Sequence, residues 1–180
     1  GLRGFATFLD RLFGQFGAYQ YSIVNSAWTA AQFARYPAAY RKRLRMIVHG
    51  VEAPAGGYDR AWARSAFGLP AQAPLLVTSG RLSVLKNHAI LLDVLAAEPD
   101  WHLAVAGEGP ERARLLARAN ALGVADRLHL VGEVARGRIH QFLAAGDVYV
   151  FPSLQETFGL AVVEAALAGL PVVATNLPVL

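Results

Sequence analysis

The sequence has no cysteine, which excludes disulfide bonds and thiolate metal sites. Lysine is scarce too, since Lys42 and Lys86 are the only two lysines among 17 basic residues. No apolar run approaches the roughly 20 residues of a membrane span, and the first residues lack the basic region and cleavage site of a signal peptide. These absences fit a reducing compartment and predict a cytoplasmic protein, with a place at the inner face of a membrane left open.

What is present is the composition of a globular chain. The 180 residues are 54% hydrophobic and 17% charged, which excludes a disordered segment and is enough for one ordinary domain with a core. The net charge of +4 suits an anionic ligand or a membrane surface. It falls short of the dense basic stripe that is typical of nucleic-acid binding, so we expect no nucleic-acid partner.

Both ends of the sequence suggest a fragment of a longer protein. The chain begins at Gly1 without a methionine, and it stops at Leu180 soon after an apolar strand expected near residues 171–175. We therefore expect further chain on either side.

The first part of the chain predicts short, mixed elements. Apolar residues at helical spacing indicate a helix over residues 2–16, and Ser26 has the place of a helix cap. The other expected elements are a strand at 19–25, a helix at 27–35, a helix from Pro37 to the basic residues 41–45, a strand at 46–49, a glycine-containing loop at 50–57 and a helix at 60–67.

From residue 75 onward, strands and helices alternate regularly. The expected strands are 75–79, 102–106, 128–131, 148–151 and 172–174, and the helices between them are 87–97, 111–122, 138–145 and 160–168. This pattern predicts right-handed βαβ units in an α/β fold, with a Rossmann-like parallel sheet and helices on both faces. Because such sheets bind ligands at the carboxyl ends of their strands, the loops after the strands form the candidate site.

The strongest motif runs from Glu156 to Glu164. Gly159 permits close backbone approach at a helix start, where free amides and the helix dipole favour an anion. Glu164 is the lone carboxylate of an apolar helix, and its burial is costly unless donors such as the two hydroxyls of a ribose face it. The alternatives are that Glu164 caps backbone or pairs with an arginine, and that Glu156 caps the helix.

Two cations follow another strand end. Gly80 ends the strand, Arg81 comes next and Lys86 follows five residues later. On such a loop both side chains can reach one diphosphate, the arginine as a fork and the lysine as a point charge; the alternative is a pair of solvated cations. The glycine loop at 107–110 resembles a nucleotide-binding loop but lacks the dinucleotide spacing, so a tight turn explains it better. The segment 131–134 could frame a base with its backbone groups, and it is equally well explained as a turn.

Together these segments resemble the C-terminal domain of the family-4 glycosyltransferases, which are retaining enzymes of the GT-B fold. The resemblance spans residues 47–180 and is carried by Gly80-Arg81-Leu82 with Lys86, Val105–Pro110, Val131–Val134, Asp147–Ser153, the E-x7-E signature Glu156–Glu164, and Gly169–Thr175. It implies that residues 1–48 end an N-terminal, acceptor-side domain that is otherwise missing, and that residues 49–180 are a donor nucleotide-sugar-binding domain, truncated at its end. His49 would be an interdomain hinge residue.

The resemblance implies a hexosyltransferase of cell-envelope or polysaccharide biosynthesis. It would move a hexose from a nucleotide-diphosphate sugar to a glycan, lipid or small-molecule acceptor with retention of configuration, without a metal and without a cofactor beyond this donor. Arg81 and Lys86 would stabilise the departing diphosphate, and Glu156 would contact the donor sugar. The implied substrate-binding residues are Gly80, Val134, Thr157, Phe158, Gly159, Leu160 and Glu164.

Three alternatives stay open. The chain is a non-catalytic nucleotide-sugar-binding module, or a sugar-nucleotide epimerase of the same fold, or it also makes a peripheral membrane contact through the helix at 2–16 and the basic cluster at 41–45. Because the acceptor side is reduced to the segment before residue 47, we expect the isolated chain to be inactive.

Overall fold

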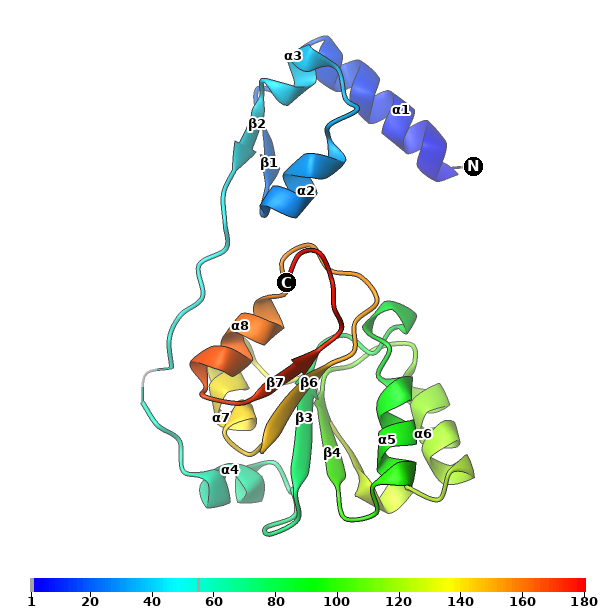
Figure 1. Ribbon diagram of the computed structural model, residues 1–180, viewed down its shortest axis with the longest axis vertical. Coiled ribbons are helices and arrows are strands. Elements are labelled where there is room, and N and C mark those ends of the chain that lie inside the picture. The colour runs from blue at the N-terminus through cyan, green and yellow to red at the C-terminus, as the bar shows by residue number, and fades with distance from the viewer. Residues whose placement is uncertain (1, 55) are drawn as a thin grey trace. The chain divides into compact units, whose positions relative to one another are not determined.

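A computed structural model describes residues 2–54 and 56–180 (Figure 1). The side chains of residues 2–6 and 15, which include Leu2 and Phe5 of the predicted amphipathic helix, lie outside the described part. The chain forms two compact units. Unit 1 comprises residues 1–50, 156–158 and 178–180, and unit 2 comprises residues 51–155 and 159–177. Each unit has a sheet of its own.

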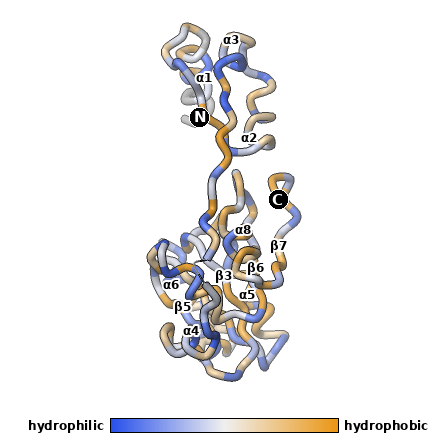
Figure 2. The backbone as a smooth tube through the Cα atoms, turned by 90° about the vertical axis from the view of Figure 1, so that its left-hand side faces the viewer, coloured by the Kyte–Doolittle hydropathy of each residue, from blue (hydrophilic) through white to orange (hydrophobic). Residues whose placement is uncertain are grey.

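Unit 2 is built on a five-stranded parallel sheet. Its strands are β3 (Leu75–Ser79), β4 (His102–Ala106), β5 (Leu128–Gly132), β6 (Val148–Phe151) and β7 (Val172–Ala174), in the order β5-β4-β3-β6-β7. The chain therefore steps outward from β3 to β5 and then returns to build β6 and β7 on the other side of β3. The tube of Figure 2 is coloured as hydrophobic at β6, as expected for a central strand. The predicted Rossmann-like sheet is confirmed.

Helices cover both faces of this sheet. The helices α5 (Ala89–Ala97) and α6 (Arg112–Ala121) lie on one face, and α7 (Ile139–Leu143) and α8 (Leu160–Leu167) lie on the other (Figure 1). Successive residues of β3 point to opposite faces, so Leu76 packs in the core under α5 and α6, and Val77 packs in the core that includes Phe142 of α7. The remaining short elements are α4 (Arg60–Ala66) and the 3-10 turns η1 (Val84–Lys86), η2 (Ala125–Arg127) and η3 (Arg136–Arg138).

A buried arginine ties the amino ends of two strands together, and sequence reasoning did not foresee it. Arg64 of α4 is 2% exposed and donates to an Asp147 carboxylate oxygen at 2.9 Å. That same oxygen accepts from the Leu75 amide at 2.8 Å, where β3 begins. The Arg64 guanidinium also donates to the carbonyls of Ala145, Pro70, Ala71 and Ala73. Each of these oxygens therefore has a hydrogen-bond donor. Burial of the guanidinium lowers the pKa of Arg64.

Unit 1 has a smaller sheet than unit 2, with two strands instead of five. It contains α1 (Leu2–Gln15), β1 (Ser22–Val24), α2 (Ala27–Gln32), α3 (Ala38–Arg41) and β2 (Leu44–Met46), and its two strands pair in parallel. Ser26 caps α2 as predicted, because its Oγ accepts from the Thr29 amide at 3.1 Å. The strand predicted at residues 46–49 is wrong, since β1 sets the register and pairs Ser22 with Leu44. The apolar residues Ile47 and Val48 that suggested it are exposed and follow the strand.

Candidate functional site

The carboxyl ends of β3 and β6 lie next to each other at the point where the strand order reverses. β3 pairs with β4 on one side and with β6 on the other. Parallel sheets bind ligands at such a point, because the loops there diverge and leave a crevice. Here the loops are residues 80–86 after β3 and residues 152–159 after β6. They meet where the Leu154 amide donates to the Leu85 carbonyl at 2.8 Å.

Glycines let the loops after β3 and β4 cross in backbone contact. A Cβ on Gly107 would stand 2.0 Å from the Gly80 carbonyl oxygen, and one on Gly109 would stand 2.3 Å from the Leu82 carbonyl oxygen. Both glycines have a positive φ, of 153° and 158°. Hydrogen bonds join the loops too, from the Gly80 amide to the Ala106 carbonyl and from the Leu82 amide to the Glu108 carbonyl, each at 2.9 Å. The predicted glycine loop is therefore part of the site's framework and not an independent turn.

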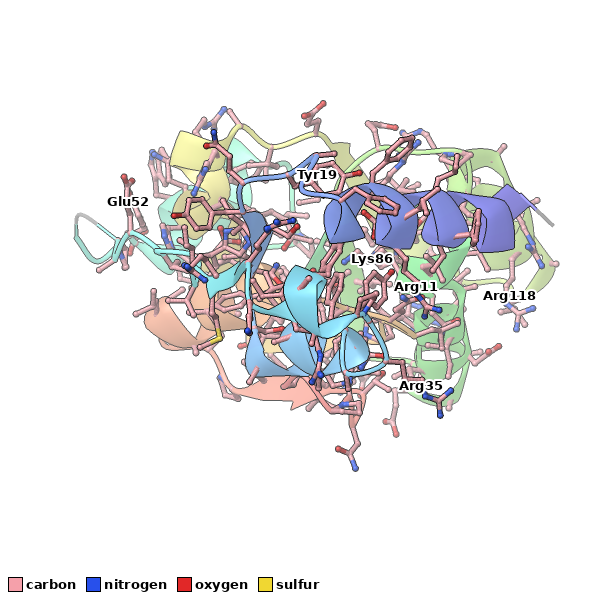
Figure 3. The ribbon with its side chains drawn as sticks, turned by 90° about the horizontal axis from the view of Figure 1, so that it is seen from above. Arg11, Tyr19, Arg35, Glu52, Lys86 and Arg118 are labelled. Atoms are coloured by element: carbon pink, nitrogen blue, oxygen red, sulfur yellow. The ribbon has the colours of Figure 1, made fainter. Side chains whose placement is uncertain are left out.

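The side chain of Lys86 lies against Gly80, at the start of the loop after β3. A Cβ placed on Gly80 would be 3.6 Å from Cε of Lys86, so the lysine stem crosses this glycine. Its Nζ stands 5.5 Å from the centre of the Phe151 ring, at the end of β6. The lysine is therefore held between the ends of the two central strands. Figure 3 labels its side chain. Arg81 is exposed directly after Gly80. The two cations thus lie on one loop at the switch point, with Lys86 partly buried.

Glu164 is less buried than the sequence suggested. The buried residue of α8 is Ala165, and Glu164 is half-buried. The cost of burying this carboxylate is therefore smaller than for a fully buried one, and its role toward a ribose stays a prediction. The Glu164 charge nevertheless affects Tyr149 of β6. Burial raises the pKa of Tyr149, and the Glu164 carboxylate raises it further.

Tyr149 lies beneath the candidate site, and sequence reasoning did not single it out. Its ring is fully buried, and its hydroxyl lies 3.0 Å from Oγ of Ser79, the last residue of β3. The Ser79 amide also donates to the Tyr149 hydroxyl at 3.3 Å. A tyrosine in an otherwise apolar strand was the available signal, since a buried phenol usually needs a partner. The phenol holds the ends of β3 and β6 together beneath the candidate site.

The start of α8 has the predicted form. Gly159 is its N-cap residue, with φ of 84°, a conformation that favours glycine. The first amides of a helix have no partner within it, so those of Leu160 and its neighbours point out of the helix start. Val134, predicted to lie near the base, is half-buried and packs against the core on the α7 side. Its side chain therefore has a packing role whatever it contacts in a ligand.

The three remaining predicted residues, Glu156, Thr157 and Phe158, are grouped with unit 1. The Thr157 carbonyl accepts a hydrogen bond from Oγ of Ser26 at 2.8 Å. The Phe158 ring is edge-on to that of His49, with centres 5.2 Å apart. The roles of these three residues toward a donor sugar, and that of His49 as a hinge, stay predictions.

Two kinds of feature are not found in the described part of the chain. Residues 2–54 and 56–180 contain no group of three or more His, Cys, Asp or Glu side chains arranged to hold a metal ion. Within the same residues, no helix combines the length and the apolar character that crossing a bilayer requires.

Comparison with known proteins identifies the family. The model of the glycosyl transferases group 1 family matches residues 59–180. The D-inositol 3-phosphate glycosyltransferase of Mycolicibacterium gilvum is 35% identical over 159 residues, which are 84% of this chain and 36% of that protein. The D-inositol 3-phosphate glycosyltransferase 2 of Catenulispora acidiphila is 33% identical over 169 residues, 86% of this chain and 39% of that protein. The chain thus spans little more than a third of the length of these relatives.

Solved structures of glycosyltransferases have the same fold as this chain. Anabaena Alr3699/HepE in complex with UDP-glucose superposes with a TM-score of 0.77 at 26% identity, over 89% of this chain and 46% of that one. The sucrose-phosphate synthase of Thermosynechococcus elongatus gives a TM-score of 0.72 at 29% identity, over 86% of this chain and 40% of that one. The architecture is that of part of a GT-B glycosyltransferase, with β3 to β7 forming its parallel sheet. By its sequence and its fold, the chain belongs to the glycosyl transferases group 1 family.

Proposed function

We propose that the chain binds the donor of a retaining hexosyltransferase, a nucleotide-diphosphate sugar, at the switch point between β3 and β6. The observation that carries the proposal is the placement of Lys86, whose stem crosses Gly80 and whose ammonium lies beside Phe151. A cation held between the ends of two central strands is well placed for the phosphates of a nucleotide. The solved relative whose complex contains UDP-glucose supports a nucleotide-diphosphate hexose as the donor.

Different residues around this point contact different parts of the donor. Arg81 and Lys86 bind the diphosphate, and the first amides of α8 supplement them, because a helix start favours an anion. Glu164 accepts hydrogen bonds from the ribose hydroxyls, and Val134 lies near the base. Glu156 contacts the sugar, with Thr157, Phe158, Gly159 and Leu160 beside the sugar and phosphates.

The transfer step needs charge stabilisation at the leaving group. The bond between the anomeric carbon and the diphosphate oxygen breaks, and negative charge develops on that oxygen. Arg81 and Lys86 stabilise this charge more in the transition state than in the bound donor, which is what lowers a barrier. The acceptor hydroxyl attacks from the same face, forms the new glycosidic bond and passes its proton to the departing phosphate oxygen. Configuration is thereby retained. The acceptor, a glycan or a lipid, binds outside the donor site.

The two cations provide the test. Alanine at Arg81 or Lys86 removes a charge-assisted contact worth about 1.5–3 kcal/mol, so each variant should bind a nucleoside diphosphate roughly tenfold or more weakly. Isothermal calorimetry with uridine, guanosine and adenosine diphosphates measures this and also reports the preferred base. The unphosphorylated nucleoside should bind with little change.

A matched control is Arg118→Ala in the last turn of α6, an exposed arginine that pairs with Asp93 of α5. It should leave affinity unchanged. If nucleoside and nucleoside diphosphate lose affinity equally in the Arg81 and Lys86 variants, these residues do not bind the diphosphate and the assignment is wrong.

A further inference from the structure

The backbone of Asn87 has a conformation that residues with a side chain rarely adopt. Its φ is 53° and its ψ is 32°, in the left-handed region, and it is the one non-glycine residue with a positive φ among residues 2–54 and 56–180. In this region the Cβ crowds the following carbonyl oxygen, a cost that glycine does not have and that asparagine tolerates better than most residues. Conformations of this kind cluster at ligand-binding sites and switch segments.

Asn87 lies between the 3-10 turn η1 and the helix α5, and it hydrogen-bonds to both. Its amide donates to the Val84 carbonyl at 3.1 Å, which closes η1, and its carbonyl accepts from the Ile90 amide at 3.2 Å, at the start of α5. Within the turn, the Lys86 amide donates to the Ser83 carbonyl at 3.0 Å. A single left-handed residue therefore sets the angle between a right-handed turn and the helix that follows it.

A change in the φ of Asn87 would move η1 more readily than α5. The helix is fixed in the core of unit 2 by three buried leucines, Leu91, Leu92 and Leu95. The turn is held by backbone hydrogen bonds, such as the one from the Leu154 amide to the Leu85 carbonyl at 2.8 Å. Rotation about the N–Cα bond of Asn87 would therefore swing η1 against a helix that stays in place.

Lys86 is the last residue of η1 and directly precedes Asn87, so its direction follows that rotation. Its stem crosses Gly80, where a Cβ would lie 3.6 Å from Cε of the lysine, and its Nζ stands 5.5 Å from the centre of the Phe151 ring. Both contacts are made at the ends of β3 and β6. A rotation at Asn87 would therefore carry the ammonium away from the switch point.

We propose that Asn87 is a positioning residue for the donor, because its left-handed backbone directs Lys86 toward the diphosphate. The proposal rests on the donor site proposed above, since Asn87 acts only through Lys86. A residue for which a φ near 53° is costly takes a negative φ instead, and η1 then carries Lys86 out of place. The conformation matters and not the amide side chain, so glycine should serve as well as asparagine.

Asn87→Val and Asn87→Gly test the proposal, because valine is β-branched and disfavours the left-handed region, whereas glycine adopts it freely. The ligand is the tightest-binding of uridine, guanosine and adenosine diphosphate, measured by calorimetry beside its unphosphorylated nucleoside. Asn87→Val should weaken diphosphate binding about fivefold or more and leave nucleoside binding nearly unchanged. Asn87→Gly should stay within about twofold of the wild type.

A double-mutant cycle separates positioning from a purely structural effect. Lys86→Ala with Asn87→Val should bind the diphosphate no more weakly than Lys86→Ala alone, because the second change has no lysine left to displace. Gly123→Val is the matched control, since Gly123 has a φ of 68° and open space around its Cβ position, beyond the end of α6. It should lower the unfolding temperature, as Asn87→Val does, and leave diphosphate affinity unchanged.

Three results would overturn the proposal. The first is that Asn87→Val lowers the unfolding temperature with diphosphate affinity unchanged, because the turn would then be structural only. The second is that Asn87→Gly loses as much affinity as Asn87→Val, because the side chain would then act. The third is a loss that persists when Lys86 is alanine. If Lys86→Ala itself leaves affinity unchanged, the donor site proposed above fails, a result distinct from these three.

Discussion

The two units differ in how completely each satisfies its own side chains. In unit 2, the strands β3, β4 and β6 are largely buried, and the buried Arg64 is surrounded by hydrogen-bond acceptors. In unit 1, two strands of three residues form the sheet, and α1 presents phenylalanines to solvent. Unit 2 therefore has a packed core on both faces of its sheet, whereas the phenylalanines of α1 have no such core among the described residues. The difference shows where the fold holds its backbone firmly, namely where buried polar groups have hydrogen-bond partners.

Glycine substitutions should separate the two units most strongly. Gly107→Ala forces a Cβ to within 2.0 Å of the Gly80 carbonyl oxygen at a φ of 153°, so backbone at the switch point must move. Strain and overlap together should lower the free energy of unfolding by about 4 kcal/mol, visible in thermal unfolding by circular dichroism.

Gly14→Ala in unit 1 meets an equally close neighbour, but that neighbour is the side chain of Tyr40. It should cost less, about 1–2 kcal/mol, and amide exchange should show the loss in unit 1 only. A larger loss from Gly14→Ala than from Gly107→Ala would contradict the idea that unit 2 is the tightly determined unit.

Acid should destabilise unit 2 through His88. This histidine at the start of α5 is 4% exposed, and within the described residues its Nδ1 has no hydrogen-bond partner. Burial, together with the Lys86 charge, lowers its pKa from 6.5 to about 4. Above pH 6.5 neither folded nor unfolded chain binds this proton, and between pH 6.5 and 4 only the unfolded chain does.

Stability should therefore fall as the pH drops through that window, by up to about 3 kcal/mol, and level off below it. His88→Asn should flatten this part of the profile, measured by urea unfolding at a series of pH values. The matched change His49→Asn, in unit 1 at an exposed histidine, should leave it as it is. A profile that is the same with and without His88 would refute the explanation.

Glu164 should have the smallest effect, and only on ligand discrimination. If its carboxylate accepts the ribose hydroxyls, the wild type prefers a ribonucleoside diphosphate over its 2′- and 3′-deoxy analogues. Glu164→Gln should lose most of that preference, a change of about tenfold, because hydrogen bonds to a charged group are worth about 1.5–3 kcal/mol. Calorimetry with the three ligands measures it. Undiminished discrimination in the variant would return Glu164 to a structural role.

The sequence predicted unit 2 far better than unit 1, for a physical reason. β3, β4, β6 and β7 begin and end at the predicted residues, because buried parallel strands appear as apolar runs bounded by turns. The short strands of unit 1 are set by pairing with each other, which local pattern does not reveal. The periodicity of residues 2–16 correctly predicted α1, but an amphipathic pattern cannot show which side packs inward.

The framework of the candidate site was predictable to a similar degree, whereas the roles of its residues stay predictions. The loops after the strands were found because topology places ligands at the carboxyl ends, and glycine positions marked the close backbone approach. Tyr149 and Arg64 were missed because their partners are distant in the sequence. Tyr149 bonds to Ser79, 70 residues away, and Arg64 bonds to Ala145, 81 residues away. The sequence could not show how far Glu164 is buried, because a helix of apolar residues does not reveal how much of it is covered.

The most direct test of the central claim is to map where a nucleoside diphosphate binds on the chain. Amide chemical shifts of the 180-residue protein, recorded while uridine or guanosine diphosphate is added, report every loop at once. The account predicts that the largest changes cluster at residues 80–86, 107–110 and 152–164, around the carboxyl ends of β3, β4 and β6. Changes confined to the opposite edge of the sheet, near residues 71–75 and 145–147, would contradict it.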